Sequence, residues 1–189
     1  MNEEESLNKK RQIMKLYDSS ARIYNRRYNM IQSRKYKFVE KLLEGKEIIL
    51  DVGCGTGLLS SFLDEKASLL IGVDISVNML KVAQGNPKRR LIREDLIRAD
   101  ADWLPFRDNV FEKVISVTVL QNMPEPRVTI KDIARVTVAG GEIAVTSLRK
   151  KHDLANLLAI ILISAPELKV TTEWDDDDED AGAILTKLI

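Results

Sequence analysis

Residues 48–58 of this 189-residue chain read IILDVGCGTGL. The apolar run at the start predicts a buried strand, and the glycines after it predict a tight turn that opens a helix. A glycine turn lets backbone and ligand approach each other without interference from a Cβ atom. The stretch therefore predicts a strand–turn–helix unit with a ligand site at the turn.

Short apolar runs alternate with helical patterns along the rest of the chain. The runs are nearly continuous, as in strands buried on both faces of a parallel sheet, and they cover residues 48–50, 69–73, 96–97, 114–120 and 143–145. Helices are expected over residues 6–44, 58–65, 76–84, 126–138 and 154–163, and an antiparallel hairpin is expected from residues 168–172 and 183–188. The pattern predicts an α/β fold, a Rossmann-like doubly wound sheet, mostly parallel, with helices on both faces.

We expect one domain over residues 1–189. Residues 6–44 would form a helical N-terminal lid, residues 45–150 the cofactor-binding core, and residues 151–189 a C-terminal helix and strand hairpin. No apolar signal segment begins the sequence, and the longest apolar run has 12 residues (154–165), short of the roughly 20 that span a bilayer. A cytoplasmic protein without a membrane segment is therefore expected.

Charge is unevenly distributed. Basic and acidic side chains number 29 each, so the formal net charge is zero, which argues against nucleic-acid binding by bulk charge. Residues 6–41, however, carry 11 basic and 2 acidic side chains, and residues 173–180 carry 7 acidic and no basic ones. The basic segment is either a solvated helix face or a lid that attracts an anionic substrate such as RNA. The acidic tract is interpreted as a solvated hairpin tip, with a partner or cation site as the alternative.

The chain has one cysteine and one histidine, so a disulfide and a zinc site of the usual Cys/His kind are both excluded. Cys54 lies within the glycine turn and is interpreted as a small packing residue. His152 follows the last expected parallel strand in a basic stretch and is interpreted as a surface side chain. No metal site is predicted.

Two acidic residues indicate the kind of ligand. Asp74 ends the second expected strand, 17 residues after Gly57, where a carboxylate can accept hydrogen bonds from both ribose hydroxyls of an adenosine. Asp51 stands just before the first glycine, where it would repel a pyrophosphate but could hold a cationic amino-acid moiety. Leu58 occupies the position of the third glycine in the dinucleotide fingerprint. These charges favour S-adenosylmethionine over NAD, which stays a weaker alternative.

The motifs that follow the turn carry a family resemblance. They are LDVGCGTG (50–57), GVDIS (72–76), ADADWLPF (99–106), FEKVISVTVLQN (111–122) and RVTVAGGE (135–142). In this order they resemble class I S-adenosylmethionine-dependent methyltransferases, most closely the ubiquinone/menaquinone-biosynthesis type and its small relatives. Residues 118–123 contain no Asn-Pro-Pro-Tyr motif, which weighs against methylation of adenine N6 or of a glutamine amide.

The resemblance implies S-adenosylmethionine as the cofactor and a set of residues that hold it. The implied cofactor-binding residues are Asp51, Gly53, Gly55, Gly57, Asp74, Ile75, Met79, Asp100, Ala101 and Val117. Asp74 would bind the ribose, Ile75 and Met79 would pack against adenine, and Asp100 would accept from the adenine amino group. Asp95 ends a near-duplicate segment, but the short distance from Asp100 to Leu104-Pro105-Phe106 matches the family better.

Residues that could line the acceptor side are Tyr17, Tyr24, Tyr28, Gln121 and Asn122; the tyrosines could equally be helix–core contacts. The sequence names no catalytic base. The expected function is methyl transfer to an unidentified acceptor, a small molecule by default. One alternative is an RNA or translation-factor methyltransferase, working with a small zinc-binding activator protein as some small relatives do. Another is a non-catalytic cofactor-binding or scaffold subunit.

Overall fold

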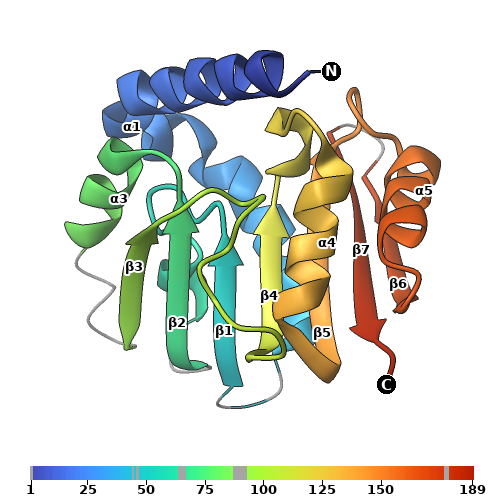
Figure 1. Ribbon diagram of the computed structural model, residues 1–189. Helices are drawn as coiled ribbons and strands as arrows, with labels where there is room; N and C mark the ends of the chain where they lie inside the picture. Colours follow the sequence, from blue (N-terminus) through green and yellow to red (C-terminus); the bar gives the residue numbers. More distant parts are fainter. Residues whose placement is uncertain (1, 44, 46, 64–66, 87–92, 177–178) are drawn as a thin grey trace.

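A computed structural model describes all residues except 1, 44, 46, 64–66, 87–92 and 177–178. One seven-stranded sheet runs through it in the order β3-β2-β1-β4-β5-β7-β6 (Figure 1). Its parallel strands are β1 (Glu47–Val52), β2 (Ala67–Asp74), β3 (Glu94–Arg98), β4 (Phe111–Val117) and β5 (Thr137–Leu148). The antiparallel hairpin of β6 (Leu168–Asp175) and β7 (Asp180–Lys187) completes the sheet beside β5.

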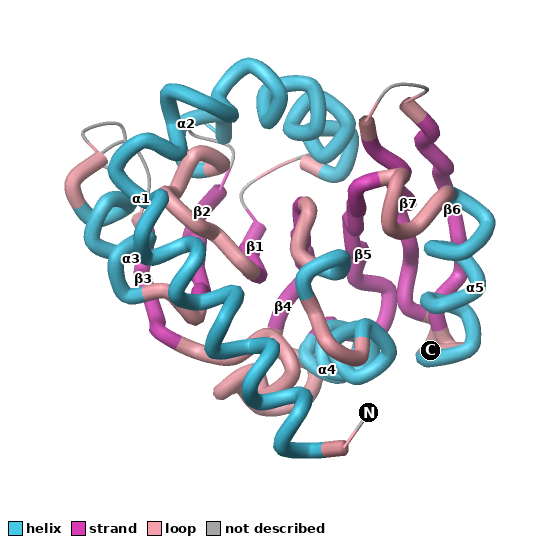
Figure 2. The backbone as a smooth tube through the Cα atoms, turned by 90° about the horizontal axis from the view of Figure 1, so that it is seen from above, coloured by secondary structure: helices cyan, strands magenta, loops and turns pink. Residues whose placement is uncertain are grey.

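Helices pack on both faces of this sheet. They are α1 (Glu3–Val39), α2 (Ser60–Leu63), α3 (Val77–Gln84), α4 (Pro126–Val136) and α5 (Leu154–Ser164), with 3₁₀ turns η1 (Glu40–Leu42) and η3 (Leu120–Asn122). Figure 2 shows them from above the strand ends. Because successive side chains of a strand point to opposite faces, Leu50 joins the core under α4 and α5, while Ile49 joins the core under the end of α1 and η1. The doubly wound sheet predicted from the sequence is confirmed.

The chain reverses its winding between β1 and β4, because β2 and β3 lie to one side of β1 while β4 and β5 lie to the other. In open α/β sheets, ligands bind outside the carboxyl ends of the strands at such a reversal. The first half of α1 crosses above these strand ends in Figure 1. The fold therefore places a covered site where the glycine turn leaves β1.

Polar contacts fasten α1 to the strand ends and the loops that follow them. An Asn2–Glu5 capping box starts the helix. Farther along, Asp18 accepts from the Ser76 hydroxyl at 2.5 Å and from the Asn78 amide at 3.1 Å. Asn25 accepts from the Thr56 hydroxyl at 2.5 Å. No described helix is both long enough and apolar enough to cross a membrane.

Several boundaries differ from the sequence predictions. The helix predicted over residues 6–44 forms one 37-residue helix that ends earlier, at Val39. Strand β4 ends at Val117 and not at residue 120, because Thr118 has a φ of 58°, which an extended strand cannot contain. Helix α4 ends at Val136, and β5 starts at once and runs for 12 residues. Within the predicted helix over 58–65, the structure describes the short helix α2. Residues 64–66 lie outside the described residues.

Candidate functional site

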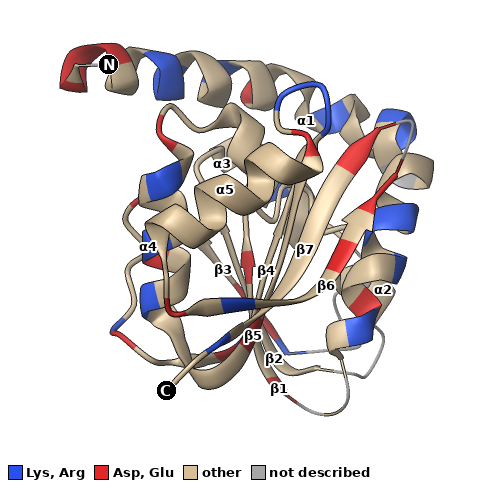
Figure 3. Ribbon diagram, turned by 90° about the vertical axis from the view of Figure 1, so that its right-hand side faces the viewer, with Lys and Arg blue, Asp and Glu red and all other residues tan. Residues whose placement is uncertain are grey.

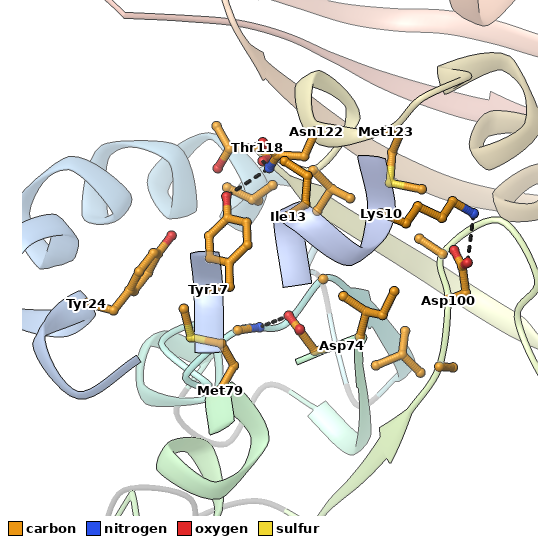
Figure 4. Close-up of a pocket in the computed structure, with 18 residues that line it drawn as sticks. Lys10, Ile13, Tyr17, Tyr24, Asp74, Met79, Asp100, Thr118, Asn122 and Met123 are labelled. Atoms are coloured by element: carbon orange, nitrogen blue, oxygen red, sulfur yellow. Dashed lines mark hydrogen bonds and ion pairs between the residues drawn. The ribbon is translucent and has the colours of Figure 1, made fainter. Parts of the chain in front are cut away.

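A cavity of about 750 Å³, its open mouth included, lies between α1 and the carboxyl ends of β1, β2 and β4. Its lower walls come from the glycine turn and the start of α3, and its far wall comes from the residues after β4. Figure 4 shows Asp74 and Asp100 at its floor and side, with Tyr17 and Lys10 of α1 reaching over it. Helix α1 is thus part of the site and not only a surface element.

The glycine turn fits a ligand that lies against backbone. Gly53, Gly55 and Gly57 all have positive φ values, 75°, 54° and 71°. A Cβ atom on Gly53 would lie 2.3 Å from Cγ2 of Val119, so this position admits no side chain. The turn is therefore held in one close-packed shape beside the cavity.

Most amide groups of this turn are already engaged. The Gly53 and Cys54 amides donate to the Val73 carbonyl at 2.8 and 3.0 Å, and the Gly57 amide donates to the Cys54 carbonyl at 3.0 Å. The Gly55 amide donates to the Asp74 carboxylate at 2.9 Å. These four amides do not form a free nest for phosphate oxygens, which counts against the NAD interpretation.

The Asp74 carboxylate is positioned to accept hydrogen bonds from hydroxyl groups of a ligand. One carboxylate oxygen accepts from the Gly55 amide and the other accepts from the Ser76 amide at 2.8 Å. Each oxygen has a second acceptor position, and Asp74 lines the cavity. Burial raises the pKa of this carboxyl despite the two amides, so a ligand that donates further hydrogen bonds stabilises the ionised form.

Asp51 is almost fully buried at the end of β1, with 5% of its surface exposed. It lines a smaller adjoining cavity of about 330 Å³ together with Gly53 and Gly55. Burial, with the charges of Glu94 and Asp74 adding to it, raises the pKa of Asp51 well above its ordinary value. A cationic group beside Asp51 would reverse that shift, so the position suits an ammonium group.

Asp100 follows β3 at the opposite end of the cavity. Lys10 of α1 donates to its carboxylate at 2.7 Å and also pairs with Asp102 at 2.5 Å. Burial lowers the pKa of Lys10, but hydrogen bonds and attraction from Asp100 and Asp102 outweigh it, and the net pKa is raised. Because this lysine is neutralised, the cavity offers carboxylates and no unpaired cation among the described residues.

The structure brings most of the predicted cofactor residues together. Those that line the main cavity are Gly53, Gly55, Asp74, Ile75, Met79, Asp100, Ala101 and Val117. Asp51 lines the adjoining one. Gly57 lies apart: a Cβ atom there would be 3.1 Å from Cβ of Ala83, so it serves the packing of α3. Asp95, the alternative to Asp100, is exposed on β3 and lines a separate shallow pocket.

A second cavity, about 1,360 Å³ with its open mouth included, lies on the other side of Tyr17 and Tyr24. Four of the predicted acceptor-side residues line it, namely Tyr17, Tyr24, Tyr28 and Gln121. The fifth, Asn122, lines the main cavity and donates to the Tyr17 hydroxyl at 2.8 Å. The acceptor-side predictions thus fall around the two cavities.

Sequence reasoning missed other lining residues. In the main cavity these include Lys10, Thr118 and Val119, and in the second they include Arg27, Gln32, Lys35, Lys150 and Glu179. Most of them come from α1 and from the hairpin end, far from the glycine motif in sequence. One signal was available, the helical spacing of Tyr17, Tyr24 and Tyr28. Gln32 and Lys35 continue this spacing and lie on the same face of α1.

The remaining candidates have structural roles. Cys54 is buried, its Sγ would be 2.9 Å from a Cβ atom on Gly72, and burial raises its thiol pKa well above the ordinary value. A buried thiol of this kind is inert as a nucleophile. His152 is half-buried, with its pKa lowered by burial. Among the described residues, no cluster of ligating side chains could hold a metal ion.

Residues 50–145, about half of the chain, match the family model described as a methyltransferase domain. The chain is 27% identical over 124 residues to the ubiquinone biosynthesis O-methyltransferase of Coxiella burnetii, covering 65% of this chain and 53% of that protein. It is 35% identical over 100 residues to the 18S rRNA (guanine-N(7))-methyltransferase of Schizosaccharomyces pombe, covering 51% and 36%. The chain therefore spans about half or less of these two curated relatives.

A solved structure from Haloferax volcanii shares the fold. It is a putative methyltransferase in complex with the Trm112 methyltransferase activator, with a TM-score of 0.72, 16% identity, and coverage of 92% of this chain and 98% of that one. The strand order, the glycine turn with its two carboxylates and the family match agree with one another. The chain belongs to the class I S-adenosylmethionine-dependent methyltransferase family.

Proposed function

We propose that this protein transfers a methyl group from S-adenosylmethionine to an acceptor bound in the second cavity. The observation that carries the proposal is the pair of adjoining cavities, one lined by Asp74 and the glycine turn and the other reached past Tyr17 and Tyr24. S-adenosylmethionine supplies an electrophilic methyl group on a sulfonium. The carboxylates of the first cavity match its ribose hydroxyls and its ammonium group.

In this proposal the chain's own residues act mainly by positioning. Asp74 binds the ribose hydroxyls, Asp51 holds the ammonium group, and Ile75 and Met79 pack against the adenine. Helix α1 covers the cavity through Lys10 and Tyr17, so it excludes water from the reacting groups. Burial raises the pKa of Tyr24 to about 12, so this phenol stays protonated at neutral pH and is not a base.

The first test is cofactor binding by calorimetry. Asp74→Ala should weaken S-adenosylmethionine binding about 100-fold, because two hydrogen bonds to a charged group are lost. Asp95→Ala removes an exposed carboxylate from the neighbouring strand and should leave binding unchanged. Equal affinity of the Asp74→Ala variant and the unaltered protein would refute the ribose assignment.

Catalysis is tested separately with a methyl-labelled cofactor and fractions of host metabolites, RNA and protein. Label in any fraction supports an enzyme and eliminates a scaffold that only binds the cofactor. If the cofactor binds with Asp74-dependent affinity and no fraction is labelled, a non-catalytic cofactor-binding subunit becomes the better account.

A second candidate is an RNA methyltransferase with an activator subunit. Arg11, Lys15, Arg22 and Arg26 are exposed on one side of α1, and the rRNA methyltransferase and the Trm112-bound structure above show that such functions occur among similar proteins. The chain's single histidine and cysteine mean that zinc would come from the partner. Co-purification from the native host tests this candidate; isolation without a second protein counts against the activator.

A further inference from the structure

The second cavity is lined by two buried polar residues, Gln32 and Lys35, as well as by exposed ones. It lies between one side of α1, the loop after β4, the end of β5 and the start of β7. Tyr17, Tyr24 and Thr118 line both this cavity and the cofactor cavity, so the two chambers meet at these residues. A molecule in the second cavity would therefore reach the place where the cofactor cavity opens.

A buried polar residue, Gln32, lines this cavity and also the smaller cavity beside Asp51. Gln32 is 6% exposed, and its amide nitrogen lies 3.3 Å from the Tyr24 hydroxyl and 3.5 Å from the Thr118 hydroxyl. Its Oε1 is buried and has no hydrogen-bond partner. A buried polar atom without a partner costs free energy, and a ligand hydroxyl would satisfy it.

Thr118 beside it holds an uncommon backbone conformation. Its φ of 58° is a rarely populated value for a β-branched residue. The strained residue is fixed by its amide, which donates to the Thr146 carbonyl and hydroxyl at 3.0 Å. Residues in such conformations cluster at functional sites, and Thr118 lines both cavities.

Aromatic rings form the α1 side of the cavity. The ring centroids of Tyr17 and Tyr24 are 6.3 Å apart, and those of Tyr24 and Tyr28 are 4.7 Å apart. The three rings run from the cofactor cavity to the mouth of the second one, and Ile31 and Leu148 add apolar surface. A flat ring can stack within such a wall at offset or tilted geometry.

The mouth of the cavity is cationic. Arg27 and Lys150 are exposed there and have no ion-pair partner among the described residues. Lys35 also lines the cavity, but Asp180 neutralises it at 3.0 Å. Glu179 is the single acid in the lining. The unpaired charge at the mouth is thus positive on balance, which suits an anionic group on the ligand.

We propose that the second cavity binds the methyl acceptor and that the acceptor is a small hydroxylated aromatic acid. Its ring lies along the tyrosines, its hydroxyl reaches Gln32, and its anionic group lies between Arg27 and Lys150. This inference rests on the proposed function, since it takes the neighbouring cavity as the cofactor site. Apart from Arg27 and Lys35, which is paired with Asp180, the basic residues of α1 do not line this cavity, which favours a small acid over RNA as its occupant.

The test is calorimetric titration of 4-hydroxybenzoate into the protein saturated with S-adenosylhomocysteine. Two related probes separate the contributions: 4-hydroxybenzamide lacks the charge, and benzoate lacks the hydroxyl. Each should bind about ten-fold more weakly than 4-hydroxybenzoate, the loss expected for one hydrogen bond to a charged or buried group. Gln32→Leu should abolish the preference for 4-hydroxybenzoate over benzoate while keeping the preference for acid over amide.

Neighbouring basic residues, one inside and one outside the cavity lining, supply matched controls. Arg27→Gln and Lys150→Gln should each weaken 4-hydroxybenzoate binding about ten-fold. Arg26→Gln and Lys151→Gln remove the same charge from adjacent exposed positions outside the cavity lining and should change it less than two-fold. Thermal unfolding of each variant establishes that the fold is kept.

Failure of the inference is distinct from failure of the proposed function. If S-adenosylhomocysteine binds but 4-hydroxybenzoate does not, or if Arg26→Gln and Arg27→Gln weaken its binding equally, the inference is overturned and the cofactor assignment stands. If S-adenosylhomocysteine itself does not bind, the proposed function fails. A single-stranded RNA that binds the complex and displaces 4-hydroxybenzoate, with Arg26 and Arg27 contributing equally, would replace the small acid by RNA.

Discussion

The buried carboxylate of Asp51 destabilises the folded protein but suits a cationic ligand. Burial raises its pKa well above the ordinary value of 3.8, so between that value and the raised one the folded state binds more protons than the unfolded state. The stability that Asp51 contributes is therefore greatest at low pH. It is lost as pH rises through this window, because the buried carboxyl then ionises. A cationic group beside Asp51 would lower its pKa again and so offset the cost of the buried charge.

Asp51→Asn keeps the shape of the side chain and removes the buried charge. At pH 8 we expect the variant to gain about 1 kcal/mol in free energy of unfolding, within the range of substitutions that relieve functional strain, and to lose most of its cofactor affinity. Urea unfolding at pH 5 and pH 8 and calorimetry check both parts. Asp95→Asn, on the exposed edge strand, should change neither, and a less stable Asp51→Asn variant at pH 8 would contradict the argument.

At the scale of the element, α1 covers the main cavity and is held there by a largely buried ion-pair cluster. The Lys10 side chain is 11% exposed and its partner Asp102 is 6% exposed. Removing one member of a buried pair leaves the other charge uncompensated. Helix α1 is therefore held to the loop after β3 by electrostatic attraction as well as by packing.

Lys10→Met retains the apolar stem and removes the charge. We expect a loss of about 3 kcal/mol in the free energy of unfolding, faster amide exchange over residues 3–17, and faster cofactor dissociation. Lys9→Met is the matched control, because Lys9 makes one long contact, 3.5 Å to the Met123 carbonyl, at the surface. Unchanged exchange over residues 3–17 in the Lys10→Met variant would show that packing alone holds α1 in place.

The sequence predicted which helices and strands form the core better than it predicted the residues at which they begin and end. Apolar runs and glycine turns are local signals, so β1, β2, α3 and the C-terminal hairpin could be found from them. The end of β4 could not, because it depends on the positive φ of Thr118, which hydrogen bonds from β5 stabilise. Boundaries set by contacts between distant segments leave no local pattern.

The same reason explains which site residues were found. The cofactor residues follow a motif, and eight of the ten predicted ones line the main cavity. Gln32 and Lys150 are separated by more than 100 positions and share no motif, so only the folded chain brings them to one cavity. Lys10 looked like one of 11 similar bases in the leading segment, and its role depends on Asp100 and Asp102.

At the scale of the whole molecule, the zero net charge is a balance between a basic N-terminal segment and an acidic C-terminal one, and the two segments contact each other. Figure 3 shows basic residues along α1 and acidic residues at the upper ends of β6 and β7. Lys35 of α1 and Asp180 of β7 form an ion pair of 3.0 Å, with side chains 3% and 2% exposed. Of the other ten bases in residues 6–41, Lys10 and Arg27 line a described cavity. Most of the basic segment therefore lies outside the lining of the two main described cavities.

The Lys35–Asp180 pair should be the main electrostatic link between these ends. Lys35→Met strands a buried carboxylate and should cost about 3–5 kcal/mol in free energy of unfolding at pH 7, whereas Lys37→Met, at an exposed position two residues away, should cost less than about 0.5 kcal/mol. Adding Asp180→Leu to Lys35→Met should recover most of the loss, because an apolar pair needs no charge compensation.

The pH dependence distinguishes this pair from ordinary packing. Burial raises the pKa of Asp180, and attraction to Lys35 opposes that rise. Without Lys35 the folded pKa lies further above the unfolded value, so the stability of the Lys35→Met variant falls more steeply than that of the unaltered protein as pH rises from 4 to 7. Urea unfolding at both pH values measures the difference. A deficit that is equal at pH 4 and pH 7 would mean that altered packing, and not the lost charge, destabilises the variant.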